Sequence, residues 1–231
     1  MATYNGARYL REQLDSILSQ LGETDELIVS DDNSTDDTRS IVDSYKDARI
    51  HLIRNSPPRG HVRNFAHAME LSQGEFIVLS DQDDIWAEGR LEHMLAGLEH
   101  APDRSLLVGD LIEFDTTGMR PTQQMLGPSP RSGIRQLWRL FFGQAKYFGS
   151  AYVFRRELLR YVLPIPAQVE AHDIWIAMNA CLHGGVVHLQ GTTLFRRIHG
   201  NNLSPERRRA MRVVLRSRVG YLRGLLQSSV R

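Results

Sequence analysis

The stretch FIVLSDQDDIW, residues 76–86, joins a short apolar run to an acidic cluster. The apolar residues 76–80 predict a buried strand, and the polar residues 81–84 predict a loop at its carboxyl end. The stretch LIVSDD, residues 27–32, has the same order of apolar and acidic residues. Strands that end in polar clusters favour an α/β sheet whose ligands bind beyond the carboxyl ends of the strands.

Working outward from these two strands, the first half of the chain alternates between expected strands and helices. Five apolar residues recur with helical spacing in residues 7–21 and predict an amphipathic helix. Ser34 with Asp37 resembles a capping box, so a second helix is expected up to about Tyr45. This alternation predicts a mostly parallel sheet with helices on both faces. The remaining elements expected in this half are strands at 50–54 and 106–114 and helices at 62–73 and 88–100.

In the second half we expect a loop, shorter helices and three strands. The chain opens with only a stub of a strand before Thr3, so the first strand is expected to lack residues upstream. The expected elements are a loop at 115–133, helices at 134–143, 155–162 and 173–183, and strands at 149–154, 186–190 and 192–197.

Composition predicts a globular chain with an uneven distribution of charge. The 231 residues carry a net charge of +1, but residues 204–231 hold eight Arg against one Glu. That segment therefore has a charge of +7 and the rest of the chain −6. Cys181 is the only cysteine, and neither a signal peptide nor an apolar run long enough for a membrane span is found. We expect a cytoplasmic protein with no nucleic-acid partner.

Three polar clusters follow expected strands: residues 3–5, 31–32 and 81–84. At one sheet edge, their carboxylates would repel each other unless a cation were bound. An Asp-rich set of ligands without cysteine prefers Mg²⁺ or Mn²⁺. Since Mg²⁺ with few protein carboxylates keeps positions open for phosphate oxygens, the pattern predicts a metal-bound diphosphate.

Five motifs in order resemble one known family. They are MATYNG (1–6), VSDDNSTDDT (29–38), LSDQDDIW (79–86), AHDIW (171–175) and RRIHGNN (196–202). Together they resemble the family 2 glycosyltransferases, most closely the rhamnosyltransferase-like branch of bacterial polysaccharide synthesis. The resemblance covers residues 1–203 and implies a GT-A domain with inverting transfer. Residues 204–231 would then form a basic helical tail.

The resemblance also implies roles for individual residues. A nucleotide-diphosphate sugar, dTDP- or UDP-linked, would be the donor, and a saccharide or lipid-linked saccharide the acceptor. Asp173 would be the general base, and Asp83 and His199 would lie at the metal. Nucleotide contacts would come from Thr3, Tyr4, Asn5, Asp32, Arg63 and Asp81, and acceptor or diphosphate contacts from Trp86, Trp175 and Arg197.

Structural alternatives exist for most of these residues. Residues 31–32 and 172–173 could cap helices, and residues 81–84 could form a solvated turn. Arg63 could belong to a plain helix start, His199 to a surface loop, and both tryptophans to the core. The rival functions are an Asp-dependent phosphotransferase or phosphatase, a nucleotidyltransferase, and a nucleotide-sugar-binding module without catalysis.

The basic tail predicts contact with the inner face of the plasma membrane. A basic amphipathic helix is typical of peripheral membrane binding. The alternative is that the apolar stripe packs on the body of the protein or on a second subunit. The apolar stripe consists of Met211, Leu215, Val219, Leu222 and Leu226. A separate basic stripe consists of Arg208, Arg212 and Arg216.

Overall fold

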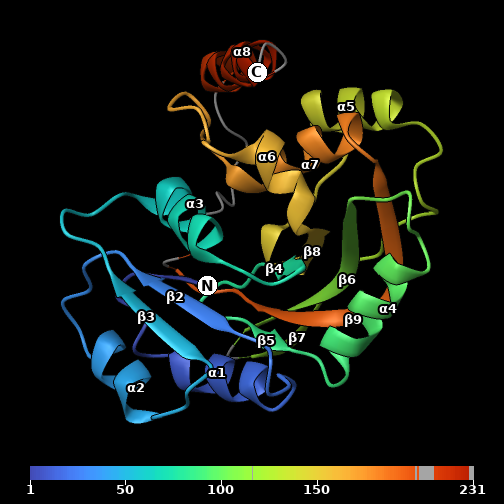
Figure 1. Cartoon of the computed structure of the whole chain (residues 1–231). Helices are drawn as coiled ribbons and strands as arrows, with labels where there is room; N and C mark the ends of the chain where they lie inside the picture. The colour runs from blue at the N-terminus through green and yellow to red at the C-terminus, as the bar shows by residue number, and fades with distance from the viewer. Residues whose placement is uncertain (116, 201, 203–210, 229–231) are drawn as a thin grey trace.

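The computed structural model describes residues 1–115, 117–200, 202 and 211–228, without the side chains of 119–124, 211–216 and 227–228. Its first half contains a parallel sheet in the order β1-β2-β3, as the alternating pattern predicts. Figure 1 shows α1 and α2 on one face of this sheet and α3 on the other. The elements are β1 (Ala2–Thr3), α1 (Leu10–Leu18), β2 (Leu27–Asp31), α2 (Thr38–Ser44), β3 (Ile50–Arg54) and α3 (His61–Leu71).

A second sheet has the order β4-β8-β6-β9-β5, with β7 paired to β6. It differs from the expected parallel arrangement, because in the described part only β6 and β9 run parallel. Strand β8 enters between β4 and β6 and runs antiparallel to both. The strands are β4 (Phe76–Val78), β5 (Ile85–Trp86), β6 (Leu106–Asp115), β7 (Gly118–Gln124), β8 (Tyr152–Arg155) and β9 (Val186–Arg197).

Helices cover the second sheet and share its core. Trp175 and Met178 of α7 are fully buried and belong to the same apolar cluster as Tyr152 and Phe154 of β8. Burial of this size is the main source of stability for such a layer. The helices are α4 (Arg90–Glu99), α5 (Gly133–Phe141), α6 (Leu159–Val162), α7 (His172–Leu182) and α8 (Met211–Ser228).

Three local expectations are wrong. The expected loop 115–133 contains β7, which pairs with β6. The two strands expected at 186–197 form one strand, β9, whose register against β6 shifts near Asp110; Gly191, with a φ of +100°, lies opposite this shift. The capping box is not formed, because the Ser34 hydroxyl donates to Asp31 instead of capping α2.

The tail helix α8 packs on the body through a face where glycine lies beside buried Tyr and Leu side chains. A Cβ on Gly224 would lie 2.9 Å from the Trp175 ring, so only glycine allows this approach. Tyr221 and Leu225 are buried beside it, whereas Val219, Leu222 and Leu226 of the expected stripe are exposed. The side chains of Arg208, Arg212, Arg216, Met211 and Leu215 lie outside the described residues. In the described part of the chain, no helix combines the length and apolar character that crossing a bilayer demands.

A cavity of about 720 Å³ is lined by residues of both sheets next to β1. Its lining includes Met1, which precedes β1, Ile28 of β2, and Ile77 and Val78 of β4. The Met1 amine donates to the Ile28 carbonyl at 2.8 Å, and burial lowers the pKa of this amine to about 5. We propose that a short apolar segment added before Met1 would extend β1 along β2 and fill this cavity.

Adding about five apolar residues before Met1 is therefore expected to raise the melting temperature by roughly 5–10 °C, since two further buried apolar side chains would suffice for this. Differential scanning calorimetry measures the shift. A polar extension of equal length is the control.

In the chain without an extension, the Met1 amine keeps its proton up to about pH 8 when the chain is unfolded, but only below about pH 5 when the chain is folded. The free energy of unfolding should thus rise with pH across this range, and both extensions should remove that rise. Equal melting temperatures for the two extended chains would contradict the proposal.

Candidate functional site

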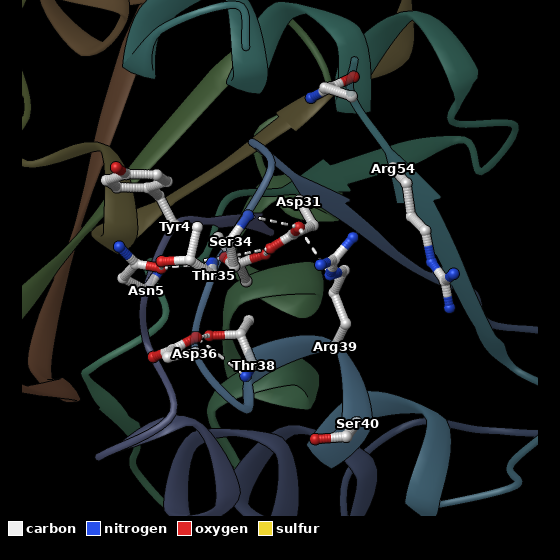
Figure 2. A network of polar contacts seen from close by, with 12 residues as sticks. Tyr4, Asn5, Asp31, Ser34, Thr35, Asp36, Thr38, Arg39, Ser40 and Arg54 are labelled. Atoms are coloured by element: carbon white, nitrogen blue, oxygen red, sulfur yellow. Dashed lines mark hydrogen bonds and ion pairs between the residues drawn. The ribbon is translucent and has the colours of Figure 1, made fainter. Parts of the chain in front are cut away.

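The end of β2 is anchored by Asp31, which is fully buried. Its carboxylate accepts a hydrogen bond from the Ser34 amide at 3.0 Å (Figure 2). It also accepts one from the Thr3 hydroxyl at 3.0 Å. Asn5 continues this network, because its amide donates to the Ser34 hydroxyl and its side-chain oxygen accepts from the Thr35 amide. Thr3 and Asn5 therefore shape the loop after β1. Figure 2 shows the neighbouring Tyr4 ring directed away from Asp31, and this ring is 56% exposed.

Asp32, the next residue, holds a different loop. Its two carboxylate oxygens accept hydrogen bonds from the backbone amides of Arg59 and Gly60, at 2.6 and 2.9 Å. These amides precede α3, so Asp32 fixes the start of that helix. Arg63, on the first turn of α3, lines a cavity of about 260 Å³ together with Pro166. The sequence indicated Asp32 as a site residue but gave no sign of this contact with the loop before α3.

The acidic loop after β4 is held from both sides by glutamines. The Gln82 side chain accepts from the Tyr4 amide at 2.8 Å and donates to the Tyr4 carbonyl at 3.1 Å. Gly6 allows this approach, because a Cβ there would lie 2.3 Å from the Gln82 side-chain oxygen. The buried Gln13 of α1 donates to the Asp81 carbonyl at 2.8 Å. The loops after β1 and β4 therefore form one rigid unit, and neither glutamine was identified from the sequence.

Crowding of carboxylates marks this loop electrostatically. The pKa of Asp81 is raised well above its usual value by burial and by the nearby Asp84 and Asp83 charges. Burial and the Asp83 charge also raise the pKa of Asp84 to about 7. The Arg196 charge acts in the opposite direction on both groups. A bound cation would relieve this repulsion, so the loop suits a positively charged ligand.

Asp83 and His199, the two residues expected at the metal, lie in contact although 116 residues separate them. Their closest atoms, Asp83 Oδ2 and His199 Nε2, are 2.8 Å apart, and the His199 ring stacks on Tyr9. An imidazole and a carboxylate together are suitable ligands for Mn²⁺. Among the residues that the structure describes, no three His, Cys, Asp or Glu side chains form a ready-made metal site. The pair therefore fits a metal whose other ligands are phosphate oxygens or water.

Arg197 fastens β9 to the acidic loop. Its backbone amide donates to Asp84 Oδ1, and its guanidinium donates to the Asp83 carbonyl, each at 3.0 Å. The guanidinium also pairs with Glu12 at 2.6 Å and lies over the Tyr9 ring. These contacts occupy the side chain, so Arg197 positions the loop that carries Asp83.

Asp173 reaches the same region from α7. Its charge is the smallest of the influences that raise the pKa of Asp81. Gly149 makes the approach possible, because a Cβ there would lie 3.2 Å from the Asp173 Cβ and 3.7 Å from Leu79 of the β4 end. The Asp173 side chain accepts from the Ile174 amide at 2.7 Å, at the start of α7.

His172, beside Asp173, is buried and joins α7 to α3. Its ring stacks on Phe65 with centroids 4.0 Å apart and meets the His61 ring edge-on at 5.0 Å. Burial lowers the pKa of His172 well below its usual value, and the His61 charge acts in the same direction. A neutral, stacked His172 fixes the start of α7 and with it the position of Asp173.

The remaining aromatic candidates lie in the core. Trp86 is 6% exposed and Trp175 is 0% exposed, and the Trp175 indole donates to the Val162 carbonyl. Neither ring presents a surface to an acceptor in this structure. Trp86 supports the site from behind, since the buried Arg90 guanidinium stacks on it at 4.6 Å. Burial lowers the pKa of Arg90 to about 9, with the Asp84 charge opposing.

The site therefore consists of acidic residues at the ends of β2 and β4, among them Asp83 paired with His199, and of the Asp173 carboxylate at the start of α7. The chain matches the family described as Glycosyl transferase family 2 over residues 1–163. It belongs to this family.

Bacterial relatives agree with this membership. The putative glycosyltransferase EpsE of Bacillus subtilis is 34% identical over 58% of this chain and 49% of its own length. An Escherichia coli protein, UDP-Glc:alpha-D-GlcNAc-diphosphoundecaprenol beta-1,3-glucosyltransferase WfgD, is 34% identical over 42% of this chain and 38% of its own length. The chain thus spans half or less of the length of these relatives.

Solved structures show that the fold is GT-A. TarS of Staphylococcus aureus, in complex with UDP-GlcNAc, has a TM-score of 0.71 at 21% identity over 87% of this chain and 58% of its own. The mannosyltransferase PcManGT of Pyrobaculum calidifontis, in complex with GDP-Man and Mn²⁺, has a TM-score of 0.64 at 18% identity over 99% of this chain and 71% of its own.

Proposed function

We propose that this protein transfers a sugar from a nucleoside-diphosphate sugar to an acceptor hydroxyl, with inversion at the anomeric carbon. The observation that supports this most directly is that Asp83, on the loop after β4, pairs with His199, while Asp173 of the separate helix α7 lies near the end of the same strand. In a direct displacement at the anomeric carbon, the leaving group and the general base must occupy separate positions around that carbon.

The donor diphosphate would lie at the carboxyl ends of β2 and β4. Mg²⁺ or Mn²⁺ held by Asp83 and His199 would neutralise the charge that develops on the departing diphosphate. The exposed Tyr4 ring would stack on the nucleotide base. The loop before α3, whose amides bond to Asp32, borders the same edge of the sheet. Asp81 would contact the ribose.

Asp173 would serve as the general base. It takes the proton of the acceptor hydroxyl as the new bond to the anomeric carbon forms and the bond to the diphosphate oxygen breaks. A single displacement gives inversion, whereas retention through a covalent intermediate needs a second nucleophile. His172 holds this base in place and does not itself act on the substrate.

Similarity to relatives directs the choice of substrates. UDP sugars are the first donors to test, because TarS was crystallised with UDP-GlcNAc and WfgD is named for UDP-Glc. WfgD is also named for a lipid-linked acceptor, a GlcNAc on diphosphoundecaprenol. A dTDP-linked sugar is also a donor to test, because the motifs resemble those of rhamnosyltransferases. With a lipid-linked acceptor, the protein would work at the cytoplasmic face of the membrane.

Release of nucleoside diphosphate from a panel of UDP-, dTDP- and GDP-sugars, with and without Mn²⁺, tests the proposal. We expect slow metal-dependent hydrolysis of one donor, accelerated by the correct acceptor, and a product of inverted anomeric configuration by NMR. Release of inorganic phosphate would instead favour a phosphatase. Tight binding without release under every acceptor condition would favour a non-catalytic module.

A further inference from the structure

Helix α5 exposes a row of large apolar side chains. Ile134, Trp138 and Phe142 follow each other at intervals of four residues and are 57%, 45% and 63% exposed. The Trp138 and Phe142 rings stack with centroids 5.7 Å apart. The opposite side of α5 packs against the core, where Leu137 and Leu140 are buried. Since soluble proteins rarely expose such rows, Ile134, Trp138 and Phe142 form a candidate contact surface. We call these three residues the aromatic row, after its two rings.

A basic row runs beside the aromatic row. Arg131, Arg135 and Arg139 have the same spacing of four, and all three are exposed. Residues 116–156 contain no Asp or Glu but seven Arg or Lys, although the whole chain has a net charge of only +1. The surface of α5 therefore combines exposed aromatic rings with exposed Arg side chains.

Helix α8 extends this surface at the same end of the molecule (Figure 1). Arg218 of α8 donates to the Leu140 carbonyl at 3.0 Å and lies over the Phe141 ring, so it joins α8 to the end of α5. Beyond Arg218, the exposed Leu222 and Leu226 add further apolar area.

We infer that α5, with the exposed face of α8, docks on an anionic bilayer. The aromatic row would enter the interfacial region and the basic row would face lipid phosphates, as in helices that lie in the membrane plane. A second copy of this chain fits less well, because a two-fold contact would bring the two basic rows together with no acid in residues 116–156 to offset them. This inference rests on the proposed function for its lipid-linked acceptor, but its test does not require catalysis.

Binding is measured by co-sedimentation of the full chain with vesicles of phosphatidylglycerol and phosphatidylcholine. Tryptophan fluorescence gives a second readout, because Trp138 is exposed whereas Trp86 and Trp175 are buried. We expect binding at low salt with a blue shift in emission, and loss of binding at high salt or with neutral vesicles. Trp138→Phe should bind but lose most of the blue shift.

Two variants test the two rows separately. Phe142→Ser together with Ile134→Ser should weaken vesicle binding roughly tenfold, and Arg135→Gln with Arg139→Gln by a similar factor at low salt. The matched controls are Leu71→Ser on α3 and Arg11→Gln with Arg54→Gln, which change exposed residues on other elements. Circular dichroism melting checks that each variant folds.

Several results would overturn the inference. These are no sedimentation of the parent chain at low salt, equal binding by the α5 variants and the parent, or an α5-dependent dimer in analytical ultracentrifugation. Donor hydrolysis in solution is measured on the same variants. Hydrolysis that is normal while vesicle binding is lost supports the docking surface. Vesicle binding in a chain that hydrolyses no donor would refute the proposed function and leave the surface intact.

Discussion

Asp173→Asn is expected to slow sugar transfer by about 10²- to 10⁴-fold, the usual contribution of a general base, while nucleotide binding stays nearly unchanged. Asparagine keeps the shape of the side chain and can still accept a hydrogen bond from the Ile174 amide, but it cannot take the acceptor proton. Initial rates at saturating donor and acceptor, together with nucleotide affinity by calorimetry, measure the two quantities.

The control for this substitution is Asp103→Asn, at a carboxylate that is 72% exposed beside Arg104. It should leave both rate and affinity unchanged. Normal turnover by Asp173→Asn would refute the role of base. A large fall in its melting temperature would show that Asp173 stabilises the start of α7 instead.

Asp83→Ala is expected to abolish the part of nucleotide binding that depends on Mn²⁺. The substitution removes one of the two side chains that fit the metal and leaves His199 alone. Calorimetric titration of UDP with and without Mn²⁺ measures this dependence. The fold should persist, because Arg197 bonds to the backbone carbonyl of residue 83 and not to its side chain.

His199→Ala is the companion variant for this prediction. It should weaken metal-dependent binding less than Asp83→Ala, because the remaining carboxylate still offers a charged ligand. If Asp83→Ala binds UDP equally well with and without Mn²⁺, and as tightly as the parent chain does with Mn²⁺, the metal assignment fails.

The sequence predicted the β2 and β4 ends well because both signals are local. An apolar run followed by acids fixes a strand and its loop within a few residues, and the structure has β2 at Leu27–Asp31 and β4 at Phe76–Val78. The juxtaposition of Asp83 with His199 was expected only through the family resemblance, since no local pattern links residues 116 positions apart.

Other features were not predictable from local patterns. Gln13 and Gln82 are ordinary polar residues in the sequence, and only the approach of α1 and the β1 loop gives them their role. Strand β7 was missed because its sequence holds Gly118 and Pro121, which are typical of loops. The stripe expected on α8 was wrong in part, because Gly224 with the buried Tyr221 and Leu225 forms the face that packs, and Val219, Leu222 and Leu226 are exposed.

The central claim is that the acidic edge of the sheet binds a nucleoside diphosphate through a divalent cation. A thermal-shift screen of UDP, dTDP and GDP, each with and without Mn²⁺, tests it most directly, because a ligand that binds only the folded chain raises the melting temperature. We predict that at least one diphosphate stabilises the parent chain only with Mn²⁺, and that Asp83→Ala loses this effect. Stabilisation of the same size without metal, or in the Asp83 variant, would contradict the claim.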